Sequence, residues 1–137
     1  MIRISHSLKT TGADAYRRNL DKLSMAVGKA AADIDATAKK SIKMNSGQWK
    51  LYGDHWSSPP GSPPNTDTGN LANSINHKMT TATSALVTVS AKYAVPLELG
   101  WHTKSLSYVP PRPFMVPAVD AVAPQFRKAV TAILRGR

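Results

Sequence analysis

The fold is decided by the stretch Ser84-Ala85-Leu86-Val87-Thr88-Val89-Ser90-Ala91, in which alanine or valine occupies every second position from Ala85. Alternate side chains of a strand point to the same face, so this spacing predicts a strand with one buried side. The preceding residues, Ser74 to Thr80, can pair with Ala85 to Ala91 across the polar turn 81–84. We therefore expect a β-hairpin over residues 74–91.

Helical patterns lie on both sides of this hairpin. From about Ala13 to Met44, after a start at Thr11 and Gly12, apolar residues recur every three or four positions and form one stripe. A second amphipathic helix is expected from about Pro117 to Gly136. The stripes comprise Leu20, Leu23, Val27, Ala30, Ile34, Ala38 and Ile42 in the first helix, and Val119, Val122, Phe126, Val130 and Ile133 in the second.

Short elements complete the expected fold. Ile2 and Ile4 alternate within residues 1–11 and indicate a short strand, and Leu71 and Ile75 suit a helical turn or a strand entry. The result is one α+β domain over residues 1–137, with a small antiparallel sheet and with the long N-terminal helix and the C-terminal helix packed on one face. The length is sufficient to bury a substantial core.

Residues 45–67 break all periodicity. The prolines at 59, 60, 63 and 64 exclude helix and central strand, while Trp49, Tyr52 and Trp56 come just before them. A loop of this length in a small domain is usually functional or disordered. We interpret it as an arm that docks on a partner such as a neighbouring subunit. The alternative is that the tryptophans cap this protein's own core.

The net charge of the chain indicates which kinds of partner it favours. The chain has 18 Lys and Arg residues against 8 Asp and Glu, a net charge of +10. Such an excess favours acidic protein surfaces or nucleic-acid phosphates, and composition leaves both open. No segment approaches the roughly 18 apolar residues of a membrane span, and no signal-peptide pattern opens the chain. The absence of cysteine fits a reducing compartment, so the expected place of synthesis is the cytoplasm.

No catalytic constellation is recognisable. The four histidines lack metal-ligand spacing, the serines lack a Gly-x-Ser-x-Gly turn, and the glycines form no phosphate loop. We expect no enzyme, no bound metal and no cofactor. A metal-dependent nuclease using Asp54, His55 and His77 is the enzymatic alternative.

Glu98 is the only glutamate and lies between Leu97 and Leu99. Burying it unpaired would be costly, and Arg112, held among prolines, is a suitable bidentate partner. The pair would fix the loop after Gly100 to the start of the last helix. An ion pair between subunits and a solvent-exposed Glu98 are the other options.

The second half of the chain carries an ordered set of short motifs. They are Thr68-Gly69-Asn70-Leu71, Ser74-Ile75, Tyr93-Ala94, Glu98-Leu99-Gly100 and Arg112-Pro113-Phe114. This order resembles the neck or tail-completion family of long-tailed siphophages. Members commonly have threonine after the glycine of Glu-x-Gly, where this chain has Trp101, and the proline-rich stretch before Thr68 is longer here.

The resemblance implies a structural virion protein that forms a ring, expected to be a hexamer, at the head–tail junction around the DNA channel. It would join head-closure to tail-terminator components. A sequence-independent DNA-binding protein is the alternative. A ring that closes by head-to-tail contacts needs two different patches on each subunit. The aromatic loop and the 101–108 loop are the expected patches, with the candidate interface residues Trp49, Tyr52, Trp56, Trp101, His102 and Tyr108.

Overall fold

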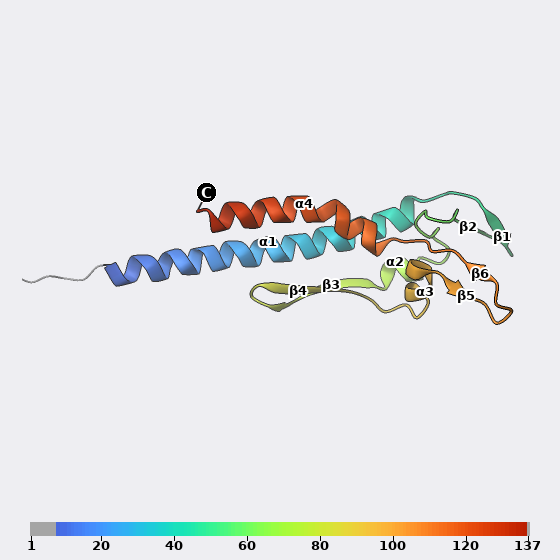
Figure 1. The fold of residues 1–137 in the computed structure, drawn as a ribbon, viewed down its shortest axis with the longest axis horizontal. Helices are drawn as coiled ribbons and strands as arrows, with labels where there is room; N and C mark the ends of the chain where they lie inside the picture. Colours follow the sequence, from blue (N-terminus) through green and yellow to red (C-terminus); the bar gives the residue numbers. More distant parts are fainter. Residues whose placement is uncertain (1–7, 137) are drawn as a thin grey trace, which may run out of the picture.

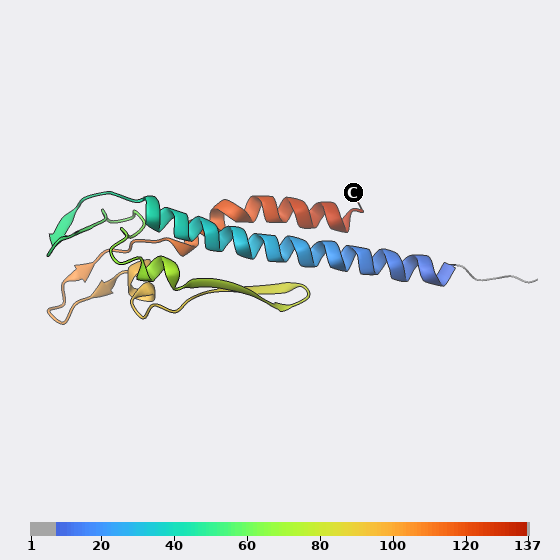
Figure 2. The same ribbon diagram turned by 180° about the vertical axis from the view of Figure 1, so that it is seen from behind.

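The computed structural model describes residues 8–136, with side chains from Gly12 onward. Its frame is α1 (Leu8–Met44), against which the antiparallel α4 (Met115–Leu134) packs along one side, as Figures 1 and 2 show. Two short helices, α2 (Asn70–Asn73) and α3 (Ala94–Leu99), lie near the C-terminal end of α1. The predicted strand at Ile2 and Ile4 lies outside the described residues.

Within residues 8–136, the strands form three separate antiparallel hairpins of two strands each. The largest packs on α1, whereas the other two lie at the end of the molecule where α1 terminates (Figure 1). The strand pairs are β1 (Lys50–Tyr52) with β2 (His55–Ser57), β3 (Ile75–Thr81) with β4 (Ser84–Val89), and β5 (Trp101–His102) with β6 (Tyr108–Val109). The predicted α+β class is confirmed, with α4 resting mainly on α1.

The predicted central hairpin is confirmed, and so is the face that it turns toward the core. Met79 opposes Ala85, His77 opposes Val87 and Ile75 opposes Val89. Val87 and Val89 pack toward α1 and the core, while the residues that alternate with them, Leu86, Thr88 and Ser90, are exposed. Because a shift of one residue would turn these valines to solvent, the burial of one face fixes the register.

The long helix is also confirmed, although it begins earlier than predicted. It starts at Leu8, so Gly12 lies inside the helix rather than at its start. Its predicted apolar stripe is the buried side, with Ala38 and Ile42 fully enclosed. The first described turns project beyond α4 and beyond the β3–β4 hairpin (Figures 1 and 2), and every residue from 12 to 19 is exposed.

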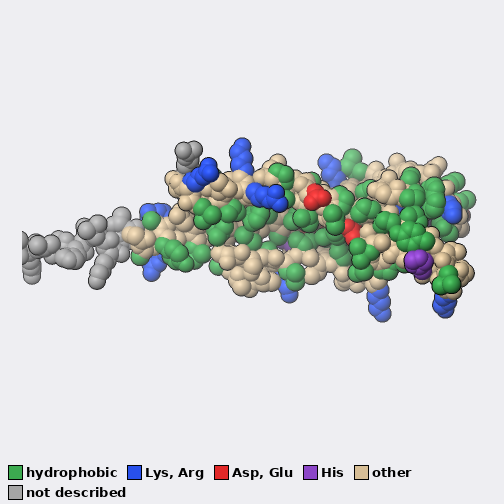
Figure 3. All heavy atoms as spheres, viewed as in Figure 1, with side chains coloured by type: hydrophobic (Ala, Val, Ile, Leu, Met, Phe, Trp, Pro, Cys, Tyr) green, Lys and Arg blue, Asp and Glu red, His purple; other side chains and the backbone are tan. Residues whose placement is uncertain are grey.

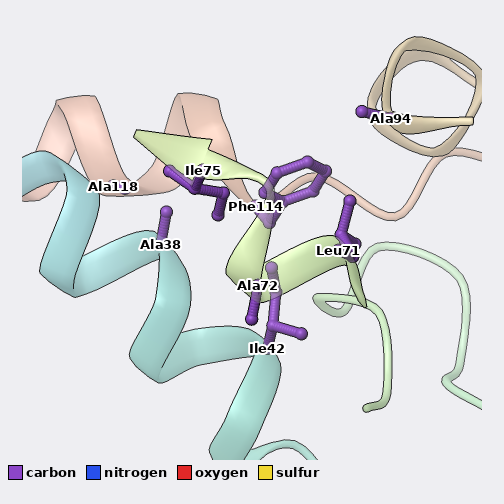
Figure 4. Close-up of a cluster of buried hydrophobic side chains, with 8 residues drawn as sticks. All are labelled: Ala38, Ile42, Leu71, Ala72, Ile75, Ala94, Phe114 and Ala118. Carbon is purple, nitrogen blue, oxygen red and sulfur yellow. The ribbon is translucent and has the colours of Figure 1, made fainter. Parts of the chain in front are cut away.

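The buried core sits where α1, α2, β3 and the start of α4 meet. Figure 4 shows Phe114 pointing in among the side chains of the other elements, including Ile75 and Leu71. Ile75 and Phe114 are almost fully enclosed. The cluster consists of Ala38, Ile42, Leu71, Ala72, Ile75, Ala94, Phe114 and Ala118. Small alanines allow the helices to approach closely around the two large side chains.

Candidate interface

The segment interpreted as an arm contains a hairpin that the sequence analysis did not predict. β1 and β2 are joined by Gly53 and Asp54, with Gly53 at a φ of 60°. Glycine adopts this left-handed conformation without steric cost, which permits a two-residue hairpin turn. Trp49, Tyr52 and Trp56 retain 39%, 62% and 40% of their surface, so none of the three is enclosed in the core.

The predicted 101–108 loop is likewise a hairpin, with Trp101 opposite Val109 and His102 opposite Tyr108. The His102 and Tyr108 rings lie 5.1 Å apart between centroids, and both residues are exposed. Gly100 has a φ of 77°, and a Cβ there would lie 2.8 Å from the carbonyl oxygen of Val109. Glycine is therefore required for the close approach of the two strands.

The two hairpins border one pocket of about 480 Å³. Tyr52 and His55 come from the first hairpin, and Trp101 and Val109 come from the second. Figure 3 shows hydrophobic side chains gathered over this end of the molecule. The two loops, expected from the sequence to be separate patches, form one surface in the structure. We call this surface, formed by β1, β2, β5, β6 and the pocket between them, the aromatic end.

Hydrogen bonds hold the first hairpin and its proline-rich return in place. Asn65 Nδ2 donates to the carbonyl oxygens of Gly47 and Trp56, at 2.6 and 2.7 Å. The Gly61 N–H donates to the Pro111 carbonyl at 2.9 Å. The aromatic side chains therefore project from a supported loop, which reduces the entropy lost when they bind a partner.

The predicted ion pair between Glu98 and Arg112 is wrong for the described chain, because both side chains have other partners. Arg112 is 5% exposed, and its Nε donates to the Ser58 carbonyl at 2.9 Å. Its guanidinium also lies 5.3 Å from the centre of the Trp49 ring, a cation–π contact. Arg112 thus fastens the first hairpin to the extended segment before α4.

Glu98 satisfies the start of α4. Its carboxylate accepts the backbone N–H groups of Phe114, Met115 and Val116 at 2.9, 3.1 and 2.9 Å. The first four N–H groups of a helix have no partner within the helix. Three of them bind Glu98 here, and the fourth position is Pro117, which has no N–H group. The predicted link between the Gly100 region and the last helix exists, but Glu98 forms it with the α4 backbone.

The residues that carry the family resemblance lie at helix ends and in the core. Gly69 has a φ of 79° and precedes α2, where the Asn70 N–H donates to Thr68 Oγ1 at 3.4 Å. The buried Ser74 hydroxyl donates to the Leu71 carbonyl at 2.7 Å. Leu71, Ile75 and Phe114 belong to the core, Pro113 precedes Phe114, and the Tyr93 hydroxyl accepts from Asn70 Nδ2 at 3.1 Å. Tyr93 thereby connects α2 with the start of α3.

A buried carboxylate that the sequence analysis missed joins the central hairpin to α1. Asp35 Oδ2 lies 2.5 Å from His77 Nδ1, and Oδ1 lies 2.6 Å from Lys39 Nζ. Burial raises the pKa of Asp35, but hydrogen bonds and charge from Lys39 and His77 outweigh it and lower that pKa. Asp35 lies about one helical turn from both Ala31 and Ala38, which are on the buried side of α1. This spacing was the signal in the sequence that Asp35 would be buried.

Asp54, His55 and His77, the residues of the nuclease alternative, do not share a site. Asp54 and His55 belong to the first hairpin, whereas His77 is on β3 and bound to Asp35. Among residues 8–136, no group of three or more histidine, aspartate or glutamate side chains is arranged to hold a metal ion.

Comparison with known proteins gives no relative: no family model matches the chain, and no curated protein or solved structure resembles it significantly. Within the described part of the chain, no helix combines the length and apolar character needed to cross a bilayer.

Proposed function

We propose that this protein is a structural component of a phage neck. In this proposal, copies assemble into a ring at the head–tail junction, around the DNA channel, and join head-closure to tail-terminator components. The observation that carries the proposal is the aromatic end, where two hairpins present exposed aromatic side chains around one pocket. The order of the short motifs in residues 68–114, which resembles the neck family, is the reason for proposing a phage neck as the assembly.

The composition of the aromatic end suits a protein interface. Tryptophan and tyrosine contribute large contact areas, and they dominate binding energy where they insert into pockets. Leu51, Leu106 and Tyr108 add further exposed apolar surface, with Leu106 83% exposed. Extended apolar patches are uncommon on soluble monomers and indicate a contact surface.

The shape of the subunit supplies a second surface. α1 begins at the end of the molecule opposite the aromatic end and projects there (Figures 1 and 2). An elongated subunit with different surfaces at its two ends can associate head to tail, and such association gives a ring when the rotation closes. The two hairpins together serve as only one of the two patches.

On the face shown in Figure 3, basic side chains are spread along the molecule rather than concentrated at the aromatic end. In a neck ring, this charge faces acidic neighbouring rings and the DNA phosphates of the channel. The net charge of +10 also supports the second candidate, sequence-independent DNA binding by a single subunit. Equilibrium binding to random duplex across salt concentrations distinguishes them: tight binding by a monomer, with a steep salt slope, favours the second candidate.

A pair of variants tests the assembly proposal. Trp56→Ala and Tyr108→Ala remove exposed aromatic side chains from different hairpins, whereas Met25→Ala removes an exposed apolar side chain from α1. We expect the first two to lower the oligomer mass in analytical ultracentrifugation while Met25→Ala does not. Equal masses for all three variants and the unaltered protein would exclude the aromatic end as the assembly surface.

Binding to neighbouring neck components forms the second part of the test. The protein is mixed with purified head-closure and tail-terminator proteins encoded beside it, and complexes are detected by their mass. The proposal predicts a complex with each of them. Self-assembly without any such complex would support a ring protein of another kind.

A further inference from the structure

We propose that the pocket at the aromatic end receives residues 1–7 of a second copy of this chain. The inference rests on the self-assembly proposed above and identifies the segment responsible for it. The pocket lies at one end of the subunit, and Leu8, the first described residue after this segment, lies at the other. Each copy would therefore provide the pocket to one neighbour and the segment to another.

The pocket is suited to apolar side chains on a short peptide. Leu71, Leu97 and Val109 contribute aliphatic wall, and Tyr93 and Trp101 contribute aromatic wall. Its volume of about 480 Å³ is within the range of cavities that enclose small ligands. A mostly apolar wall of this size favours one or two aliphatic side chains.

Residues 1–7 have a matching pattern. In an extended backbone, Ile2 and Ile4 project to the same face and Arg3 projects to the other. Asp67 lines the pocket and is exposed, so its carboxylate is available to Arg3 when the isoleucines enter. This combination of apolar insertion and charge complementarity gives the contact a defined orientation.

Chain length excludes the pocket of the same copy. Ile42 lines the pocket and follows Leu8 by 34 positions of the helix. At about 1.5 Å per residue this helix spans roughly 51 Å, whereas seven extended residues reach at most about 25 Å. Residues 1–7 therefore cannot reach the pocket of their own copy.

The pocket wall also contains polar atoms that need partners. Ser58 Oγ and Asn65 Oδ1 are buried and have no hydrogen-bond partner among the described residues. Buried polar atoms are generally paired in a completed structure. A small movement of the wall would let the N–H and C=O groups of an entering extended segment pair with them. The flanking two-stranded hairpins offer open strand edges to the same segment.

Disulfide trapping tests the inference directly, because the chain has no cysteine of its own. Ile4→Cys and Thr66→Cys are prepared as separate single variants, mixed and mildly oxidised. Thr66 lines the pocket and is exposed. The expected product is a dimer containing one chain of each variant. Mixing Ile4→Cys with Met25→Cys is the control, and at least about tenfold less mixed dimer is expected because the two Cα atoms must come within roughly 7 Å.

A second pair of variants is independent of cysteine. Asp67→Lys places a positive charge beside the proposed position of Arg3, and Asp120→Lys makes the same change on an exposed part of α4. We expect Asp67→Lys to weaken self-association at least about tenfold and Asp120→Lys to have little effect beyond the shared change in net charge.

The outcomes separate this inference from the proposed function. If the unaltered protein assembles but the mixed disulfide forms no better than the control, the inference is overturned and self-assembly is retained. If the unaltered protein is a monomer at every concentration and no mixed disulfide forms, both fail. A mixed disulfide at the pocket together with loss of assembly in Asp67→Lys supports both.

Discussion

Glu98 Oε2 accepts the backbone N–H of Phe114 at 2.9 Å, across 16 positions of sequence. Phe114 is the N-cap residue immediately before α4 and is buried in the core, so this contact links the beginning of the helix to the position of the aromatic ring. α4 has no capping side chain of its own at Phe114. A carboxylate from α3 provides the cap and also suits the positive end of the helix dipole.

Replacing Glu98 should destabilise the fold. Glu98→Ala leaves three N–H groups at the start of α4 without their acceptor and removes a favourable charge, at a cost of about 2 kcal/mol. Glu98→Gln keeps an acceptor and should cost less. Urea unfolding measures both, with Asp120→Ala as the control on the exposed side of α4. An equal loss in Glu98→Ala and Asp120→Ala would contradict the assigned role.

Replacing Arg112 should loosen the first hairpin. Arg112→Ala leaves the Ser58 carbonyl without its donor and exposes one face of Trp49, so we expect a loss of about 2 kcal/mol. Arg112→Lys keeps the charge but cannot reproduce the Nε hydrogen bond, so it should recover only part of the stability. Full recovery by lysine would mean that charge alone matters. Urea unfolding and tryptophan fluorescence report the two effects.

The stability of the folded protein at acidic pH should depend on the ionisation of Asp35. Because the pKa of Asp35 is lowered from its usual 3.8 in the folded protein, its contribution is present above that value and disappears as the pH falls through the lowered pKa. The stability advantage of the unaltered protein over Asp35→Asn should therefore shrink as the pH falls below about 3.8. Asp33→Asn, at an exposed lysine pair, is the control and should show a smaller change. A constant advantage across this range would refute the assignment.

Two glycines should respond to alanine in opposite directions. Gly100→Ala forces a Cβ into a backbone with positive φ and against the Val109 carbonyl, so it should cost more than about 1 kcal/mol. Gly12 is an exposed position of α1 with open space around it, and Gly12→Ala should stabilise by about 0.5–1 kcal/mol. Thermal unfolding of both variants tests the pair, and changes of the same sign would contradict it.

The sequence predicts elements best where periodicity reflects burial. The valines of β4 alternate because one face of the hairpin lies toward α1, and the α1 stripe follows the same logic with a helical period. The β1–β2 hairpin had a local signal in Gly53-Asp54 between short strand-forming runs, and the prolines that follow obscured it.

Partners distant in sequence are much harder to predict. Nothing near Glu98 indicates that its carboxylate reaches the N–H groups of residues 114–116, although an uncapped helix start must find an acceptor somewhere. The meeting of Tyr52 and Trp101 at one pocket also depends on how the loops are anchored, through contacts such as Arg112 with Ser58. The interface residues were identifiable by type, and their arrangement was not.

The central claim is that the aromatic end joins copies of this chain. Native mass spectrometry of the purified protein over a range of concentrations tests it most directly. We predict one closed assembly, six copies by the resemblance, whose dissociation shifts to higher protein concentration when Trp56 is replaced by alanine. A single subunit mass at every concentration, unchanged by Trp56→Ala, would contradict the claim.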